Sequence, residues 1–210
     1  ILQPMLGNGS NNWAVGPKLS RTGSTLLAND THLGISLPGI WFEQQLEQSG
    51  NNVYGGGFVG APGVFVGFNA QIAWAVTNGS TDVSDWYEIR FNDATSLEYS
   101  GPNGPATARL IKEKIKVHRG TDQIVPLLWT ELGPVVTRKG DRGLVLRWTV
   151  HDGSNAVKLF RDLNEARTFD ECQKVLAGFH APIQNVICAD PKAIGITHAG
   201  VTPIRWRGQG

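Results

Sequence analysis

The sequence has little of what zinc-binding, disulfide-rich, membrane-spanning and nucleic-acid-binding proteins depend on. Its only cysteines are Cys172 and Cys188, so neither a zinc ribbon nor a framework of several disulfides is supported, and whether the two pair stays open. No stretch approaches the roughly 18 apolar residues that a transmembrane helix needs. The 19 Lys and Arg residues against 18 Asp and Glu leave a net charge of +1, which creates no field that recruits nucleic acid or an anionic membrane. We expect a soluble chain whose partner is small or neutral.

Several common functional motifs are also absent. The 5 histidines show no metal-ligand spacing, and there is no G-x-S-x-G elbow of an α/β-hydrolase. Residues 55–60, Gly-Gly-Gly-Phe-Val-Gly, match the dinucleotide-binding glycine pattern, but apolar β runs follow where that motif needs a helix. We interpret this segment as a glycine-rich bend. The basic residues between Arg109 and Arg119 alternate with apolar ones, which indicates a solvated strand face.

What the sequence does contain is mainly β pattern, with 26 glycines and 11 prolines. Short apolar or alternating runs separated by turn residues predict a β-dominated chain. Asn69 and Ala70 predict a tight hairpin, because Asn tolerates positive φ. There is no internal repeat, which favours one domain or a large piece of one. The predicted strands are 13–15, 25–28, 41–46, 64–68, 72–77, 86–91, 108–117, 123–128, 135–137, 144–150, 185–189 and 194–198.

One segment breaks the β pattern. Thr168 and Glu171 have capping-box spacing, and the apolar residues that follow fall on one face of a 3.6-residue period. Gly178 is typical of a left-handed helix stop. The spacing predicts a helix over 169–177.

The dipeptide Gly9-Ser10 is a candidate self-cleavage site, and Ser10 is a candidate nucleophile. A serine hydroxyl is a poor nucleophile without a neighbouring base, but an N-terminal serine supplies that base as its own α-amine, whose pKa lies near 7.7–8.0. To reach that state the chain must be cut before Ser10, and the hydroxyl can attack the preceding carbonyl itself. Gly9 suits this attack because it has no side chain to block it. By itself, Gly-Ser is also a common turn pair.

The context of Ser10 resembles the penicillin acylase family of N-terminal-serine amidohydrolases. The resemblance runs from Gly9 to about Gly200, and its segments occur in the family's order. These segments are Gly-Ser-Asn-Asn-Trp at 9–13, Leu-Ala-Asn-Asp-Thr-His-Leu-Gly at 27–34, Pro-Gly-Val-Phe-Val-Gly-Phe-Asn at 62–69, Ile-Ala-Trp-Ala-Val-Thr-Asn at 72–78, Asp-Val-Ser-Asp-Trp-Tyr at 82–87 and Gln-Asn-Val-Ile-Cys-Ala-Asp at 184–190.

The resemblance implies a role for particular residues. Ser10 corresponds to the nucleophile, exposed by autocatalytic cleavage at Gly9-Ser10, and Asn78 to the residue whose backbone N–H is one oxyanion donor. His32 lies where some family members use a histidine to orient the serine region. Leu33 and Val66 correspond to residues that line the acyl pocket, although core packing explains them equally well.

The segment 82–85 matches the family's calcium loop. The resemblance implies that Asp82 and Asp85, with the carbonyl of Ser84, help to bind a structural Ca²⁺, which takes six to eight oxygen ligands. An Asp-rich turn before a strand is the alternative interpretation. No organic cofactor is expected.

The resemblance also implies what lies outside these residues. Residues 1–9 are expected to end a spacer, and residues 10–210 to form the N-terminal part of an acylase β-chain, within an αββα sandwich that carries additional β structure. The second oxyanion donor is expected beyond residue 210, and the partner α-chain before residue 1. We therefore expect little or no hydrolase activity from this piece alone. The resemblance also implies that the precursor is periplasmic or secreted.

Two functions from different classes follow. The first is an acylase that cleaves the amide between an acyl group and an amine, acting through Ser10. The second is a non-catalytic β-rich exported binding module in which Gly9-Ser10 is only a turn. The sequence leaves the acyl specificity open among penicillins, cephalosporins, acyl-homoserine lactones and acylated peptides.

Overall fold

The computed structural model describes residues 9–153 and 155–205, which fall into two compact units. The first unit combines residues 1–81 with 153–202, and the second combines 82–152 with 203–210. Residues 1–8, nearly all of the predicted spacer, lie outside the described residues.

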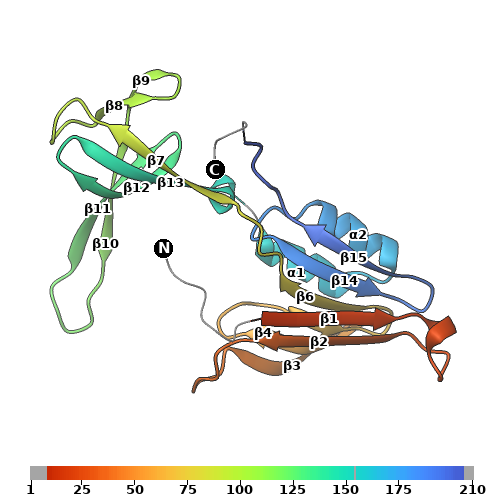
Figure 1. Cartoon of the computed structure of the whole chain (residues 1–210). Helices are drawn as coiled ribbons and strands as arrows, with labels where there is room; N and C mark the ends of the chain where they lie inside the picture. Colours follow the sequence, from red (N-terminus) through yellow and green to blue (C-terminus); the bar gives the residue numbers. More distant parts are fainter. Residues whose placement is uncertain (1–8, 154, 206–210) are drawn as a thin grey trace. The chain divides into compact units, whose positions relative to one another are not determined.

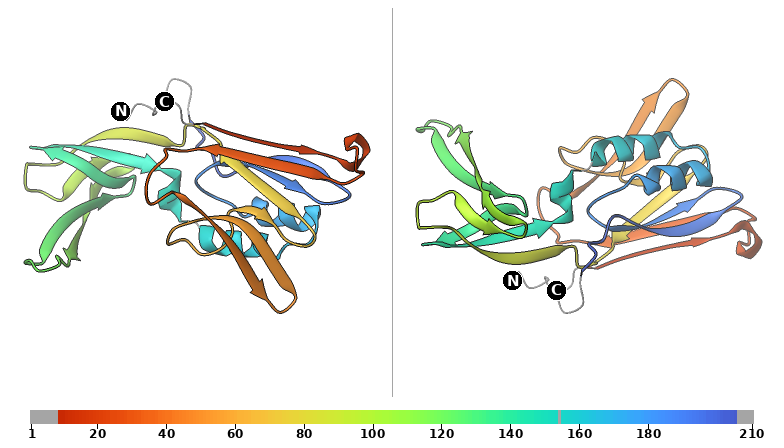
Figure 2. Two further views of the ribbon diagram at one scale, coloured as in Figure 1. Left: turned by 90° about the horizontal axis from the view of Figure 1, so that it is seen from below. Right: turned by 90° about the horizontal axis from the view of Figure 1, so that it is seen from above.

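The first unit is built on a six-stranded antiparallel sheet with the strand order β15-β14-β6-β5-β4-β3 (Figure 1). The two helices cover one face of this sheet, and the hairpin β1–β2 lies on the other side, so three layers are seen edge-on in Figure 2. The core between sheet and helices includes Trp74, Val64 and Leu163. The elements are β1 (Gly9–Val15), η1 (Pro17–Leu19), β2 (Leu26–His32), β3 (Trp41–Gln48), β4 (Asn51–Phe58), β5 (Val66–Phe68), β6 (Ala73–Asn78), α1 (Ala156–Glu165), α2 (Phe169–Ala177), β14 (Gln184–Ala189) and β15 (Ile194–Ala199).

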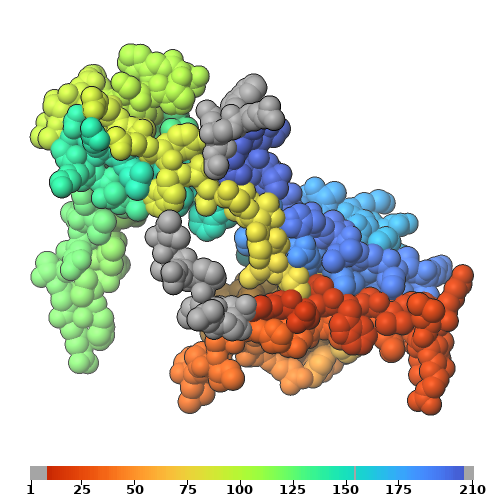
Figure 3. Space-filling view, in the orientation of Figure 1, coloured from red at the N-terminus to blue at the C-terminus, as the bar shows by residue number. Residues whose placement is uncertain are grey.

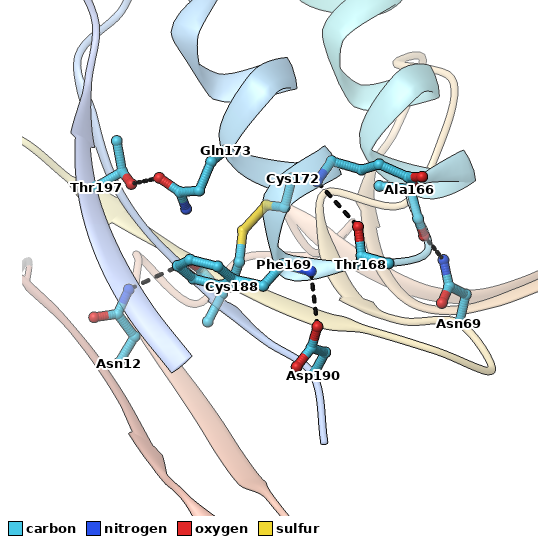
Figure 4. Close-up of a disulfide and its surroundings, with 12 residues drawn as sticks. Asn12, Asn69, Ala166, Thr168, Phe169, Cys172, Gln173, Cys188, Asp190 and Thr197 are labelled. Atoms are coloured by element: carbon cyan, nitrogen blue, oxygen red, sulfur yellow. Dashed lines mark hydrogen bonds between the residues drawn. A yellow bond between two sulfur atoms is a disulfide. The ribbon is translucent and has the colours of Figure 1, made fainter. Parts of the chain in front are cut away.

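The structure pairs the two cysteines. Cys172 on α2 and Cys188 on β14 form a disulfide, and both side chains are fully buried (Figure 4). Nearby, Thr197 Oγ1 donates to Gln173 Oε1 at 2.6 Å. The helix layer is thus joined covalently to the sheet that carries Asn78.

The second unit is all β apart from one short 3₁₀ turn. Its five-stranded antiparallel sheet has the order β10-β11-β12-β13-β7, and its small core centres on Phe91, Tyr99 and Val145. The hairpin β10–β11 projects from the rest of this unit (Figure 3). The elements are β7 (Ser84–Arg90), β8 (Glu98–Gly101), β9 (Gly104–Thr107), β10 (Arg109–Ile115), β11 (Gln123–Thr130), β12 (Gly133–Lys139), β13 (Arg142–Trp148) and η2 (Thr149–Asp152).

The predicted β-dominated α+β fold is confirmed, and every predicted strand overlaps an observed one. The predicted helix over 169–177 is α2, and Thr168 Oγ1 accepts from the Glu171 N–H at 3.2 Å as the capping pattern requires. The stop at Gly178 is not left-handed as predicted. Gly178 has φ −89° and ends the helix through a tight bond from its N–H to the Val175 carbonyl at 3.1 Å.

The predicted bend at residues 55–60 was wrong over most of its length, whereas the predicted hairpin at Asn69 and Ala70 is confirmed, with Phe68 paired to Ala73. Residues 55–57 belong to strand β4 and not to a bend, because glycine lets β5 approach closely: a Cβ on Gly55 would lie 2.7 Å from the Cα of Gly67. Asn69 does not use positive φ. Its Oδ1 instead accepts from the N–H groups of Gln71 and Ile72, both at 2.9 Å, and so closes the turn through the side chain.

Helix α1 was not predicted. Asn155 begins it by accepting from the Lys158 N–H at 2.9 Å, but the helix buries only a narrow stripe. That stripe includes Asn164, whose Oδ1 accepts from the Val64 N–H at 2.9 Å and whose Nδ2 donates to the Val64 carbonyl at 2.7 Å. The apolar residues Leu159, Phe160 and Leu163 nevertheless fall at helical spacing, so the pattern of α1 was present in the sequence.

Candidate active site

Ser10 lies near the start of β1, where it is directly opposite Thr31 of β2. Its Oγ donates a hydrogen bond to the Gly9 carbonyl oxygen at 2.6 Å. Residues directly opposite in an antiparallel pair share one face. Ser10 and Thr31 therefore face one way, while Gly9 and its partner His32 face the other. The hydroxyl thus lies beside the peptide bond that the sequence marks for cleavage.

Two asparagines connect this hairpin to the central sheet. Asn29 Oδ1 accepts from the Val76 N–H at 2.8 Å, and Asn29 Nδ2 donates to the Val76 carbonyl at 3.0 Å. Asn12 Nδ2 donates to the carbonyls of Ala75 and Asn185, at 3.4 and 3.3 Å. Asn29 thus completes the hydrogen bonding of β6 where β5, which pairs only with Ala73 and Trp74, no longer reaches. These contacts fix the strand that carries Ser10 against β6 and β14.

An apolar cavity of about 360 Å³ opens beside Ser10. Its walls are mainly aromatic and aliphatic, and its polar groups include those of Ser10, Thr31, Thr77 and Asn78. A concave apolar site with a few convergent polar groups is the usual form of a small-molecule site. The remaining lining residues are Leu33, Trp41, Phe58, Phe65, Val76, Ala156, Phe160, Phe179, Pro182 and Gln184.

Asn78 ends β6 at the edge of this cavity. In an antiparallel strand the backbone N–H and C=O of one residue point to the same side, and successive residues alternate. Val76 directs both groups to Asn29. The N–H of Asn78, two residues further on, therefore points to the same side as that of Val76, toward the hairpin that carries Ser10.

His32 lies on the outer face of the hairpin. Its Nε2 is 3.0 Å from Asp30 Oδ2, and its Nδ1 is 3.7 Å from the position that a Cβ on Gly9 would occupy. A proton on Nε2 satisfies the Asp30 carboxylate, and leaves Nδ1 as an acceptor beside Gly9. His32 is close to the Gly9 backbone, whereas the Ser10 hydroxyl faces the other side.

The family profile of penicillin amidase matches residues 2–210. The chain belongs to the penicillin amidase family. It is 32% identical over 217 residues to an acyl-homoserine lactone acylase, QuiP, of Pseudomonas aeruginosa, a match that covers 96% of this chain and 26% of that protein. It is 31% identical over 132 residues to the penicillin acylase 2 proenzyme of a Pseudomonas species, covering 62% of this chain and 17% of the relative.

Among solved structures, the thermostable penicillin G acylase of Alcaligenes faecalis matches with a TM-score of 0.83 at 25% identity. The match covers 95% of this chain and 37% of that one. This chain spans about a quarter of the length of the curated acyl-homoserine lactone acylases it matches. Within the residues that the structure describes, no helix is long and apolar enough to cross a membrane.

The two predicted acyl-pocket residues lie in different places. Leu33 lines the cavity beside Ser10. Val66, on β5, instead lines two neighbouring surface hollows, one of which it shares with Thr25 and Leu27. Trp41, Phe58 and Phe160 contribute to the cavity and were not singled out from the sequence, because they come from three separate elements.

The predicted calcium loop lies in the second unit and faces an arginine. Arg205 Nε donates to both oxygens of Asp85, at 2.8 and 3.1 Å, and its Nη2 lies 3.3 Å from Asp82 Oδ1. The Asp82 carbonyl also accepts from Arg205 Nη1 at 3.2 Å. The hydrogen bond that Arg205 donates to Asp85 raises the pKa of Arg205. Because a guanidinium already uses these oxygens, this arrangement does not fit a calcium ion. Over the described ranges, no group of three or more His, Cys, Asp and Glu side chains gathers to hold a metal.

Proposed function

We propose that this chain is the nucleophile-bearing part of an amide hydrolase that removes an acyl group from an amine, with Ser10 as the nucleophile. The observation that carries the proposal is the position of Ser10. Its hydroxyl contacts the Gly9 carbonyl at the mouth of an apolar cavity, in a chain of the penicillin amidase family.

Self-cleavage is the first step. Ser10 Oγ attacks the Gly9 carbonyl carbon, and the Gly9–Ser10 C–N bond breaks as the acyl group moves to oxygen and the hydroxyl proton moves to nitrogen. Water then hydrolyses the resulting ester, releasing Gly9 as a carboxylate and Ser10 as a free N-terminal amine. We propose that His32, held by Asp30 beside Gly9, orients this junction.

Turnover uses the new amine. The α-amine accepts the Ser10 Oγ proton through a water, and Oγ adds to the substrate carbonyl. The backbone N–H of Asn78 donates to the oxyanion of the tetrahedral intermediate. The C–N bond breaks, the leaving amine takes the proton, and water hydrolyses the acyl-enzyme on Ser10. The second oxyanion donor comes from a part of the precursor outside these residues.

The cavity supports an apolar acyl group as the substrate class. Leu33 and the aromatic walls offer no charge to the acyl chain, whereas Val66 lines the neighbouring hollows and not this cavity. The relatives named for acyl-homoserine lactone and penicillin suggest the amine side of the substrate. We propose that the α-chain and the rest of the β-chain come from the same precursor, which acts in the periplasm or outside the cell.

A structural Ca²⁺ at Asp82, Ser84 and Asp85 stays a prediction, and no step above depends on it. If it binds, calcium must displace Arg205 from the carboxylates. Calorimetric titration of Ca²⁺ into the chelator-treated protein measures this directly. Tight binding would establish the calcium site. The absence of a heat signal would contradict it and would indicate that Asp82 and Asp85 pair with Arg205 alone.

Mass spectrometry of the full-length precursor tests the proposal. We expect a new N-terminus at Ser10, accompanied by hydrolysis of N-acyl amides. Ser10→Ala is expected to abolish both. Ser24→Ala, an exposed serine in the turn before β2, is the matched control and should leave both intact. A precursor that stays uncut and still binds acylated ligands would favour the non-catalytic binding module instead.

A further inference from the structure

A row of polar side chains crosses three strands of the central sheet. Thr77 on β6 is directly opposite Asn185 on β14, which is directly opposite His198 on β15. The preceding residue of β6, Val76, and its partner Val186 belong to the core against the helices. Because side chains alternate along a strand, Thr77, Asn185 and His198 point away from the helices.

This row is hydrogen-bonded from end to end. His198 Nδ1 lies 2.6 Å from Asn185 Oδ1. Asn185 Nδ2 donates to Thr77 Oγ1 at 3.2 Å and to the Asn78 carbonyl at 3.3 Å. Since the amide nitrogen of Asn185 is the donor, its Oδ1 is the acceptor, and His198 Nδ1 carries a proton. His198 therefore fixes the orientation of the Asn185 amide.

His198 also holds the turn that follows Asn78. Its Nε2 lies 2.9 Å from Thr81 Oγ1, and Thr81 Oγ1 lies 3.3 Å from the Gly79 carbonyl oxygen. Ser80 has a positive φ of 50°, which is rare for a residue with a side chain. Gly79 packs so tightly that a Cβ on it would lie 2.9 Å from His198 Cε1. The His198 imidazole therefore packs directly against the turn formed by Gly79, Ser80 and Thr81.

These contacts fix both peptide planes that flank Asn78. The plane from Thr77 to Asn78 is held by the ladder with β14. The plane from Asn78 to Gly79 is held at both ends, by Asn185 Nδ2 on the Asn78 carbonyl and by the Ile183 carbonyl, which accepts from the Gly79 N–H at 2.9 Å. Because a peptide unit is planar, holding both planes fixes φ and ψ of Asn78.

We propose that Asn185 and His198 are positioning residues for the oxyanion donor, acting through the backbone of Asn78. This inference rests on the proposed function, in which the Asn78 N–H stabilises the tetrahedral intermediate. Such donors are effective because they are oriented before charge develops, so they need no reorganisation during the reaction. Losing the contacts of Asn185 and His198 loosens the Asn78–Gly79 peptide and, with it, the end of β6 that carries the N–H, which weakens transition-state binding more than ground-state binding.

The test uses the full-length precursor and a chromogenic N-acyl anilide. Asn185→Asp keeps the shape of the side chain and an acceptor for His198 but removes the donor to the Asn78 carbonyl. His198→Gln removes the imidazole that orients Asn185. Thr197→Val is the matched control, because Thr197 neighbours His198 on the other face of β15 and bonds Gln173 of α2.

The N-terminus of each protein is established first by mass spectrometry. A wild-type precursor that is not cleaved before Ser10 would contradict the proposed function itself. For processed proteins we expect Asn185→Asp to lower kcat about 10- to 100-fold and His198→Gln about 10-fold, with KM within about twofold, below the 10²–10³ typical of deleting a donor. Thr197→Val should keep kcat within about twofold.

Two kinds of result would contradict the positioning role of Asn185 and His198. Values of kcat for Asn185→Asp and His198→Gln that match Thr197→Val would overturn it, as would a rise in KM at unchanged kcat. If Asn185→Asp is not processed, Thr81→Val gives the same test, because it removes only the hydroxyl that bonds His198. We expect it to lower kcat about three- to tenfold without changing the melting temperature, and an unchanged kcat would sink the proposal.

Discussion

The two units of this chain use polar side chains in opposite ways. In the first unit, asparagine amides are drawn inward to satisfy backbone groups: Asn29 at Val76 and Asn164 at Val64. In the second unit, the ion pairs of Arg142 with Glu88 and Lys114 with Asp122 are exposed, and the buried Thr130 bonds backbone groups of its own turn. Exposed ion pairs contribute little, whereas a buried amide that loses its partner is costly. The unit with the candidate site is thus the more sensitive to single substitutions.

The largest difference should come from the disulfide. Replacing both Cys172 and Cys188 with alanine opens a link between residues 16 apart and is expected to lower the free energy of unfolding of the first unit by about 3 kcal/mol. Hydrogen exchange read by mass spectrometry separates the units. Amides of α2 and β14 should lose protection, while those of β12 and β13 should not. Equal loss in both units would mean that they unfold together, and would break the comparison.

Elements stabilised by contacts close in the sequence could be predicted from it, whereas elements that depend on distant residues could not. Helix α2 was predicted to its observed bounds because its cap and its apolar period lie within the segment itself. Strand β4 was not, because Gly55 is explained only by Gly67 on another strand. The segment around Ser10 carried the family resemblance from which the proposed nucleophile was chosen.

The contacts that hold the site could not be predicted in the same way. Asn29 bonds a residue 47 positions away, and Asn185 lies 108 positions from Thr77. The available signal was chemical. Asparagine is depleted in strands. Asn185 lies in a predicted strand, and Asn12 and Asn29 lie directly beside predicted strands, so their side chains are expected to form hydrogen bonds and not to pack in a core.

A smaller effect is expected at Asn29. Asn29→Ala leaves the N–H and carbonyl of Val76 without their side-chain partner and should cost about 1–3 kcal/mol of stability. It should also slow cleavage at Ser10, because the hairpin loses its attachment to β6. Urea unfolding and a time course of processing measure the two effects. Asn52→Ala, an exposed asparagine on β4, is the control and should stay within about 0.5 kcal/mol of wild type. Equal effects of the two substitutions would remove the special role of Asn29.

The smallest effect should come from Asp190, in the turn between β14 and β15. Burial works to raise the pKa of this carboxyl, but N–H groups of Phe169, Lys192 and Ala193 donate to it, and the pKa is lowered overall. A depressed pKa contributes stability above the unfolded value of about 3.9, and this contribution is lost as the pH falls through the folded pKa.

Asp190→Asn should therefore destabilise the first unit at pH 7, by about 0.3–1 kcal/mol for a charge at the N-terminus of α2, and its effect should diminish as the pH falls through the folded pKa of Asp190. Asp93, in the second unit, provides the comparison, because its pKa is lowered by hydrogen bonds from Thr95 and Ser96 at an exposed turn. Solvent screens an exposed charge, so Asp93→Asn should change the pH dependence of unfolding less than Asp190→Asn does. Urea titrations from pH 2 to 7 with region-resolved hydrogen exchange would show this order. The reverse order would mean that the two units do not differ in how strongly their polar groups are coupled to the fold.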